Sequence, residues 1–249
     1  MASIQEQLAL KIKMERIFKK EVTKIFNAIA ANFKIAVLST GLPPDSSSFK
    51  SVWEVALRTH YKRVQKAFTG IVKQSPPDDL VSVFLTWLNK RAPEQAEAIT
   101  EETKINMSES LQLAELQAVE DALLLTPIER AINSTAILKK KFKSRTQTLI
   151  NTETQAASES AKFMEAEVLS GVKPRILGGR EESDTRKKWT TVGDKRVRPA
   201  HKMANGQTRK LNEPYEVGGE LLMHPGDASL GASLGNLANC RCISTYSFY

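Results

Sequence analysis

The chain has 249 residues, of which 41% are hydrophobic and 26% charged, an ordinary composition for a globular protein of one large domain or two smaller ones. It contains no run of 18 apolar residues, and its two cysteines are separated by a single residue, so the composition argues against a membrane-spanning protein and a disulfide-rich secreted one. The formal net charge of +8 favours polyanionic surroundings, such as nucleic acid or an acidic protein partner.

The N-terminal half is predicted to be helical. Apolar residues recur every three or four positions over residues 3–39, 48–68 and 110–125, which is the spacing of one face of an α-helix. The first residues of the chain mix charged and apolar side chains and lack the continuous apolar core of a signal peptide. We therefore expect helices that pack through their apolar faces, in a reducing, intracellular setting.

Glycines and prolines are predicted to mark the helix ends in this half. Gly41 and the prolines after it end the first helix, because glycine suits the position just past a helix end. A short helix capped by Ser75 is expected to end at Pro93, since proline cannot donate the hydrogen bond that a helix interior needs. Residues 94–106 are mixed in pattern, and the sequence leaves open whether they are helical or a mobile connection.

Thr126 begins the clearest local signal. Threonine can cap a helix, Pro127 suits its first turn, and Glu129 can reach back to the amide of the cap. A helix is predicted from Pro127 to about Leu169, with a break. A basic run lies in its middle: Lys139, Lys140, Lys141, Lys143 and Arg145. Such a run is either a solvated face or a binding surface for a polyanion or an acidic partner.

The pattern changes at Gly171. Ten of the twelve glycines lie at or after this residue, and short stretches rich in β-formers follow at 188–192, at 215–223 around a Gly-Gly turn, and at 241–246. The sequence therefore predicts an α+β protein. A mainly helical N-terminal region would cover residues 1–125, and a small C-terminal α+β domain with short antiparallel strands would cover residues 126–249.

Four possible metal ligands lie in this C-terminal region: His201, His224, Cys240 and Cys242. Histidine nitrogen and cysteine sulfur are the ligands that Zn²⁺ prefers, and a structural zinc would tie together a small unit with many turns. The alternative is that the cysteines pack as small buried residues and the histidines hydrogen-bond to turns. The residues indicate no other cofactor.

A second polar group could act on phosphates. Asp194, Arg196, Arg198 and His201 combine an acid, two guanidinium groups and an imidazole, which would suit a nuclease or a nucleotide transferase. A structural pair of Asp194 and Arg198 that fixes the loop is favoured instead. The reason is that no paired carboxylates, no glycine-rich phosphate loop and no Ser/His/Asp arrangement accompany this group.

Several of these residues occur in an order that resembles a known family. The order is Asn151-Thr-Glu-Thr154, Trp189, Asp194-Lys-Arg-Val-Arg198, His201, Gly206, Gly218-Gly219, Pro225-Gly-Asp227 and Asn239-Cys-Arg-Cys242. Over roughly residues 126–246 the chain resembles the phage Mu F-like minor head proteins, the head morphogenesis family. The family usually has an arginine before Thr-Glu, where this chain has Asn151. If that arginine pairs with an acid such as Asp194, then Arg145 or Arg198 is expected to compensate.

The resemblance implies a minor head protein of a tailed phage or prophage that acts in head assembly and DNA packaging or delivery. Its expected partners are the portal protein, a scaffold or major capsid protein, and phage DNA bound without sequence preference. The expected locations are the interior of the virion head or the portal vertex, and the host cytoplasm during assembly. Catalysis, a small-molecule substrate and a membrane are not expected. The alternative is a metal-dependent nucleic-acid-processing enzyme or a toxin-like domain.

The predicted site residues fall into two sets. Residues expected to form a structural motif, some of which should meet in space, are Glu153, Trp189, Asp194, Arg198, His201, Cys240 and Cys242. Residues expected to contact nucleic acid or an acidic partner are Lys139, Lys140, Lys141, Lys143, Arg145, Lys187, Lys188, Lys195 and Arg196.

Overall fold

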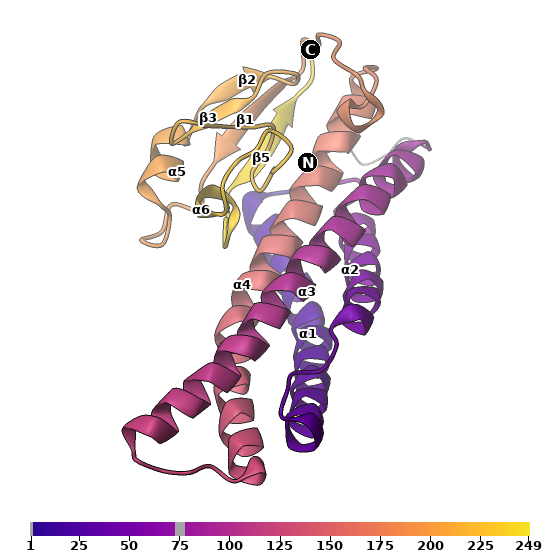
Figure 1. The fold of residues 1–249 in the computed structure, drawn as a ribbon. Helices are drawn as coiled ribbons and strands as arrows, with labels where there is room; N and C mark the ends of the chain where they lie inside the picture. Colours follow the sequence, from indigo (N-terminus) through magenta and orange to yellow (C-terminus); the bar gives the residue numbers. More distant parts are fainter. Residues whose placement is uncertain (1, 73–77) are drawn as a thin grey trace. The chain divides into compact units, whose positions relative to one another are not determined.

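The structure, a computed structural model, describes residues 2–72 and 78–249, and it confirms the predicted α+β class (Figure 1). Four long helices come first: α1 (Ile4–Thr40), α2 (Ser47–Phe68), α3 (Leu80–Glu120) and α4 (Pro127–Leu169). Short elements follow: η1 (Arg175–Leu177), β1 (Arg186–Thr190), α5 (Pro199–Ala204), β2 (Thr208–Lys210), β3 (Tyr215–Val217), β4 (Glu220–Leu222), α6 (Leu234–Leu237) and β5 (Ile243–Ser247).

The chain divides into two compact units. The C-terminal unit contains Met1–Arg16, His60–Asn89 and Thr148–Tyr249, and the helical unit contains Ile17–Thr59 and Lys90–Gln147. This division differs from the expected one at residue 125, because α1, α2, α3 and α4 each contribute residues to both units.

One prediction about α3 is wrong: Pro93 lies inside the helix and does not end it. The stretch 94–106, for which the sequence left helix and connection open, is helical, and α3 continues to Glu120. The side chains of Ala92, Ala96 and Ile99 are buried, so packing of this face outweighs the hydrogen bond that proline cannot make. The expected cap at Ser75 lies outside the described residues. By length and composition α1 contains a window apolar enough to cross a membrane, a test that core helices of soluble proteins also pass.

The predicted start of α4 is confirmed. The backbone nitrogen of Thr126 donates to the Glu129 carboxylate at 2.9 Å, and the backbone nitrogen of Glu129 donates to the Thr126 hydroxyl at 3.2 Å. These reciprocal bonds satisfy amides that a helix start leaves unpaired. The helix then runs to Leu169 without the expected break.

The strands form two small antiparallel sheets, both in the C-terminal unit. One sheet has the order β2-β1-β5, with Lys187 opposite Tyr246 and Trp189 opposite Ser244. The other is the predicted hairpin of β3 and β4, in which Gly218 and Gly219 adopt φ of 60° and 80°. Glycine carries no Cβ, so it takes this left-handed conformation without strain. Strand β2 was not predicted from the sequence.

A buried charge network joins α1, α4 and β5 in the C-terminal unit. The Glu159 carboxylate accepts from Lys11 Nζ and from Lys162 Nζ, each at 2.9 Å, and from the backbone nitrogen of Ser244 at 3.0 Å. Lys162 Nζ also donates to Gln7 Oε1 at 2.9 Å. Burial opposes ionisation of Glu159, but the two ammonium groups prevail and lower its pKa. This network anchors the first turns of α1 on α4.

Candidate metal centre

Three of the four predicted metal ligands meet in the C-terminal unit. Nδ1 of His201 lies 3.4 Å from Sγ of Cys242 and 3.7 Å from Sγ of Cys240, and the three ligand atoms all lie within 4.8 Å of one another. All three side chains are buried, with at most 4% of the residue surface exposed. The ligands come from α5, from the turn after α6 and from the residue before β5.

Local sequence explains how these ligands converge. Arg198 precedes α5 with extended backbone and Pro199 opens the helix, so His201 falls in its first turn. Asn239 adopts a φ of 54° just before Cys240, a left-handed conformation that asparagine tolerates better than most residues. The turn places both cysteines beside His201.

The turn at Asn239 is held against α4. The Asn239 side chain accepts from Asn151 Nδ2 at 2.9 Å and donates to the hydroxyl of Thr148 at 3.2 Å. Its backbone nitrogen donates to the hydroxyl of Thr152, also at 3.2 Å. Asn151, the residue that departs from the family pattern, therefore has a direct structural role here.

The expected pair of Asp194 and Arg198 is wrong. Asp194 instead accepts two hydrogen bonds from the guanidinium of Arg241, each at 2.6 Å. Arg198 donates to the carbonyl of Ala238, and its Nη1 lies 3.4 Å from the Asn236 carbonyl and 3.5 Å from His201 Nε2. The carbonyls at the end of α6 attract Arg198, whereas Arg241 presents its planar fork to the carboxylate.

Arg241 and Asn239 hold the chain beside the cluster, but they were not among the predicted site residues, although both belong to the Asn239-Cys-Arg-Cys242 motif. Both flank Cys240 directly, and this adjacency is the signal that could have found them. Arg145 was the other arginine expected to pair with Asp194. It belongs to the helical unit and pairs with Glu102 at 2.5 Å.

The two thiols differ in their acidity. Hydrogen bonds from Cys242 and His201 favour the thiolate of Cys240 and lower its pKa well below the ordinary value for a thiol. The same hydrogen bond to Cys240, together with burial, raises the pKa of Cys242. The Cys240 thiol therefore loses its proton more readily than an ordinary thiol, and a cysteine sulfur must be deprotonated to bind a metal.

The geometry fits a metal ion. Zinc held tetrahedrally at about 2.3 Å from sulfur and about 2.0 Å from nitrogen sets the nitrogen–sulfur separation at about 3.5 Å. The separations of 3.4 and 3.7 Å bracket this value. Within residues 2–72 and 78–249, no fourth His, Cys, Asp or Glu joins the group. The cluster of His201, Cys240 and Cys242 could therefore hold a metal ion.

Two other predicted site residues lie apart from the three ligands. His224, a predicted zinc ligand, is not in the group: its Nε2 lies 3.4 Å from the Ser160 hydroxyl, and its Nδ1 lies 3.2 Å from the Pro225 carbonyl. Glu153 accepts a hydrogen bond from the Tyr61 hydroxyl at 2.5 Å. The predicted Trp189, in contrast, packs edge-on against His201, with ring centroids 5.6 Å apart.

The predicted nucleic-acid contacts also separate into two classes. Lys187 is completely buried, and its Nζ donates to the Met223 carbonyl at 2.7 Å, so its prediction as a contact residue is wrong. The alternation of β1 turns Lys187 inward between exposed neighbours. Exposed residues of the predicted set are Lys139, Lys140, Lys143, Lys188, Lys195 and Arg196.

Comparison of the chain with family models, with curated proteins and with solved structures found no match. The function is therefore argued from the residues and their geometry.

Proposed function

We propose that the chain is a minor head protein of a tailed phage or prophage, similar to the Mu F-like proteins, that acts in head assembly and DNA packaging or delivery. One observation carries the proposal. Four of the dispersed residues that resemble the family form one buried group, in which Trp189 and His201 contact each other and His201 contacts Cys240 and Cys242. Convergence of this kind is expected of a motif that maintains a domain.

The partners follow from the same proposal. We infer that the portal protein is the principal partner, and that a scaffold or major capsid protein and phage DNA are further ones. The net charge of +8 supports proximity to DNA. The corresponding locations are the interior of the virion head or the portal vertex, and the host cytoplasm during assembly.

The metal is proposed to be a structural zinc. Two sulfurs and one imidazole nitrogen are a donor set that suits zinc, and their burial suits an ion that stabilises the fold. With the metal bound, the first turn of α5 would be joined to the chain segment that enters β5.

A catalytic role is not proposed for this cluster, because its three side chains are buried and a nucleic-acid substrate needs an open path to the reacting atoms. The competing function, a metal-dependent nucleic-acid-processing enzyme, can be separated by assay. DNA incubated with the chain and Mg²⁺, Mn²⁺ or Zn²⁺ should stay intact. Cleavage that His201→Ala abolishes would replace the head-protein proposal with the enzyme.

Incorporation into heads tests the proposal directly. Heads purified from cells that produce the phage should contain the chain in few copies, and the portal protein should co-purify with it from lysates. Cys240→Ser should reduce incorporation, whereas Lys62→Gln, which changes an exposed residue outside the predicted sites, should not. Heads that lack the chain, and that assemble and deliver DNA equally well after deletion of its gene, would overturn the proposal.

A further inference from the structure

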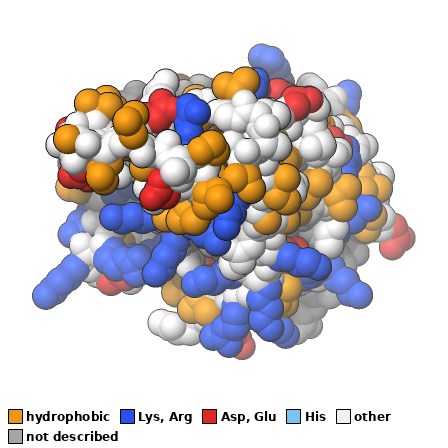
Figure 2. All heavy atoms as spheres, turned by 60° about the horizontal axis from the view of Figure 1, so that its bottom comes forward, with side chains coloured by type: hydrophobic (Ala, Val, Ile, Leu, Met, Phe, Trp, Pro, Cys, Tyr) orange, Lys and Arg blue, Asp and Glu red, His pale blue; other side chains and the backbone are white. Residues whose placement is uncertain are grey.

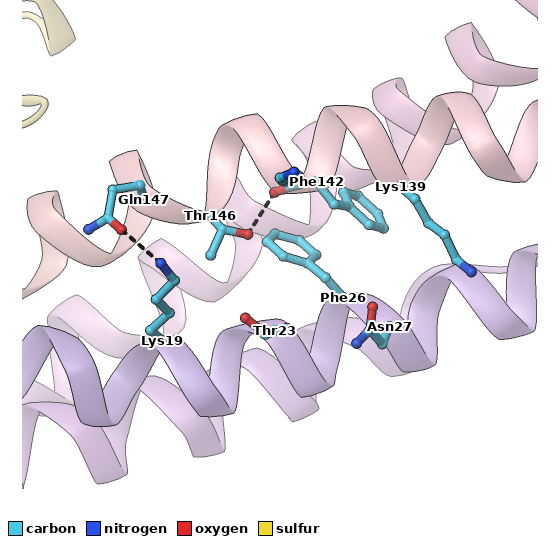
Figure 3. Close-up of a pocket in the computed structure, with 9 residues that line it drawn as sticks. Lys19, Thr23, Phe26, Asn27, Lys139, Phe142, Thr146 and Gln147 are labelled. Atoms are coloured by element: carbon cyan, nitrogen blue, oxygen red, sulfur yellow. Dashed lines mark hydrogen bonds between the residues drawn. The ribbon is translucent and has the colours of Figure 1, made fainter.

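A groove between α1 and α4 in the helical unit is lined by basic and neutral polar side chains that can bind an anion (Figure 3). It encloses about 470 Å³, and the charged side chains that line it are Lys19 from α1 and Lys139 and Lys143 from α4. Its polar neutral groups are Thr23, Asn27, Thr146 and Gln147. The lining contains no carboxylate, so a ligand in the groove would meet only positive charge and neutral polar groups.

The floor of the groove is rigid and apolar. The rings of Phe26 and Phe142 stack with centroids 4.3 Å apart and an interplanar angle of 18°, and both residues are buried. Figure 3 shows Lys139 extending from α4 across to α1, and Lys19 donates to Gln147 Oε1 at 3.5 Å from the other end. The three lysines of the groove thus surround a pair of stacked, buried aromatic rings.

The stretch of α4 that lines the groove contains no acid, since no Asp or Glu occurs between Glu129 and Glu153. Acids one turn from a lysine can form stabilising pairs along a helix. Lys139 and Lys143 have no such acid on α4, whereas Lys19 on α1 has Glu15 one turn before it.

Helix α3 supplies acids to the other side of the basic run on α4. Arg145 pairs with Glu102, Lys141 with Glu109 and Arg130 with Glu115, and all three acids belong to α3. Among the residues that the structure describes, Lys139 and Lys143 form no ion pair, and both are exposed. The basic run is therefore divided into a neutralised face and a face whose charge is available to a ligand.

We propose that this groove binds phosphate groups, with Lys19, Lys139 and Lys143 as the cations and the neighbouring hydroxyl and amide groups as further donors. Lys139 and Lys143 are one helical turn apart, about 6 Å along α4, so successive phosphates of a nucleic-acid strand can each meet one ammonium group. Figure 2 shows several Lys and Arg side chains near one another on the face that it displays, among hydrophobic and neutral side chains.

The inference rests on the proposed function only for the choice of phage DNA as the strand. The preference for phosphate stands on the groove, and a free phosphate-bearing molecule has the same chemistry. Binding to the groove and incorporation into heads are separate measurements, so either proposal can fail while the other holds.

Binding assays on the full chain test the groove with two probes: a fluorescent single-stranded oligonucleotide and inorganic tripolyphosphate. The test variant is Lys139→Gln with Lys143→Gln. The control is Lys20→Gln with Lys34→Gln, which removes the same charge from exposed lysines of α1 that do not line the groove. The test variant should weaken oligonucleotide binding about tenfold at low salt and reduce the salt slope by about 1.4, since each single-strand phosphate contact contributes about 0.7.

The outcomes separate the sources of phosphate. Loss of both probes in the test variant, with the control changed less than about twofold, supports a nucleic-acid strand in the groove. Loss of tripolyphosphate alone supports a free phosphate ligand in the same groove. Equal weakening by test and control variants would overturn the proposal, as would binding of polyglutamate without binding of either phosphate probe. An unchanged melting temperature establishes that the variants fold.

Discussion

At the scale of single residues, the cluster of His201, Cys240 and Cys242 makes a stoichiometric prediction. The purified chain should carry about one zinc ion, and Cys242→Ser should lose it because two ligands hold zinc far less well than three. His224→Gln should keep the metal even if the variant is less stable, since His224 lies outside the group.

Elemental analysis of the parent, Cys242→Ser and His224→Gln measures the zinc content directly. A chelator should lower the melting temperatures of the parent and of His224→Gln, but not that of Cys242→Ser. A binding contribution of about 2.7 kcal/mol is expected when free zinc is one hundred times its dissociation constant. A parent protein that binds no zinc, and whose melting temperature does not respond to added zinc, would refute the prediction.

Lys187 should make stability depend on pH in an unusual direction. Burial lowers its pKa to about 7, although Asp227 and Glu167 partly oppose the shift. Between pH 7 and about 10 the unfolded chain holds a proton on this lysine that the folded chain has released, so the contribution of Lys187 to stability rises with pH.

Urea unfolding of the parent and of Lys187→Met at pH 7 and pH 9 isolates this contribution. The stability of the parent relative to the variant should increase with pH, by at most about 1.4 kcal/mol per pH unit. Lys188→Met, a change at the exposed neighbour, should show a difference that does not vary with pH. A parent advantage that shrinks towards pH 9 would contradict the assignment.

At the scale of secondary-structure elements, Glu159 holds α1, α4 and β5 together. Glu159→Gln removes the negative charge between two buried ammonium groups, so Lys11 and Lys162 would lose their common partner. Removing one member of a buried ion pair typically costs about 3–5 kcal/mol.

Denaturant titration of the full chain measures the loss. Glu182→Gln is the matched control, because Glu182 pairs with Lys210 at 2.9 Å on the exposed surface. This control should unfold like the parent. If Glu159→Gln had the same free energy of unfolding as the parent, the buried charge network would not be what stabilises the start of α1.

The elements also show where sequence patterns succeed and where they stop. The start of α4 and the hairpin at Gly218 were predictable because they depend on residues only a few positions apart. The continuation of α3 through Pro93 was not, because burial of Ala92 and Ala96 depends on distant packing partners. Local chemistry therefore predicts turns and caps better than it predicts interruptions.

In the candidate site, too, the sequence predicted what depends on neighbouring residues and not what depends on distant ones. The ligand types in the C-terminal region were evident, but His201 and His224 are chemically equal in a sequence, and only the fold brings one of them to the cysteines. Asp194 finds its partner in Arg241, which lies 47 positions further along the chain. Periodicity and spacing carry no information on pairs so far apart, so the wrong arginine was expected.

At the scale of the whole molecule, the two compact units determine what a shortened chain can contain. Residues Met1–Arg16 and His60–Asn89 belong to the same unit as the strands. A fragment that begins at residue 126 therefore lacks Lys11 and Gln7, which the buried network uses. Experiments on the metal centre and on the groove accordingly use the full chain.

The buried network has a consequence for synthesis on the ribosome. Glu159 follows its partner Lys11 by 148 positions, and Lys162 follows Gln7 by 155 positions. At about 5–20 residues per second, the first turns of α1 therefore wait for about 7–30 seconds before the contacts that bury them can form. The C-terminal unit thus closes only after the ribosome has added the whole helical unit and the second half of α4.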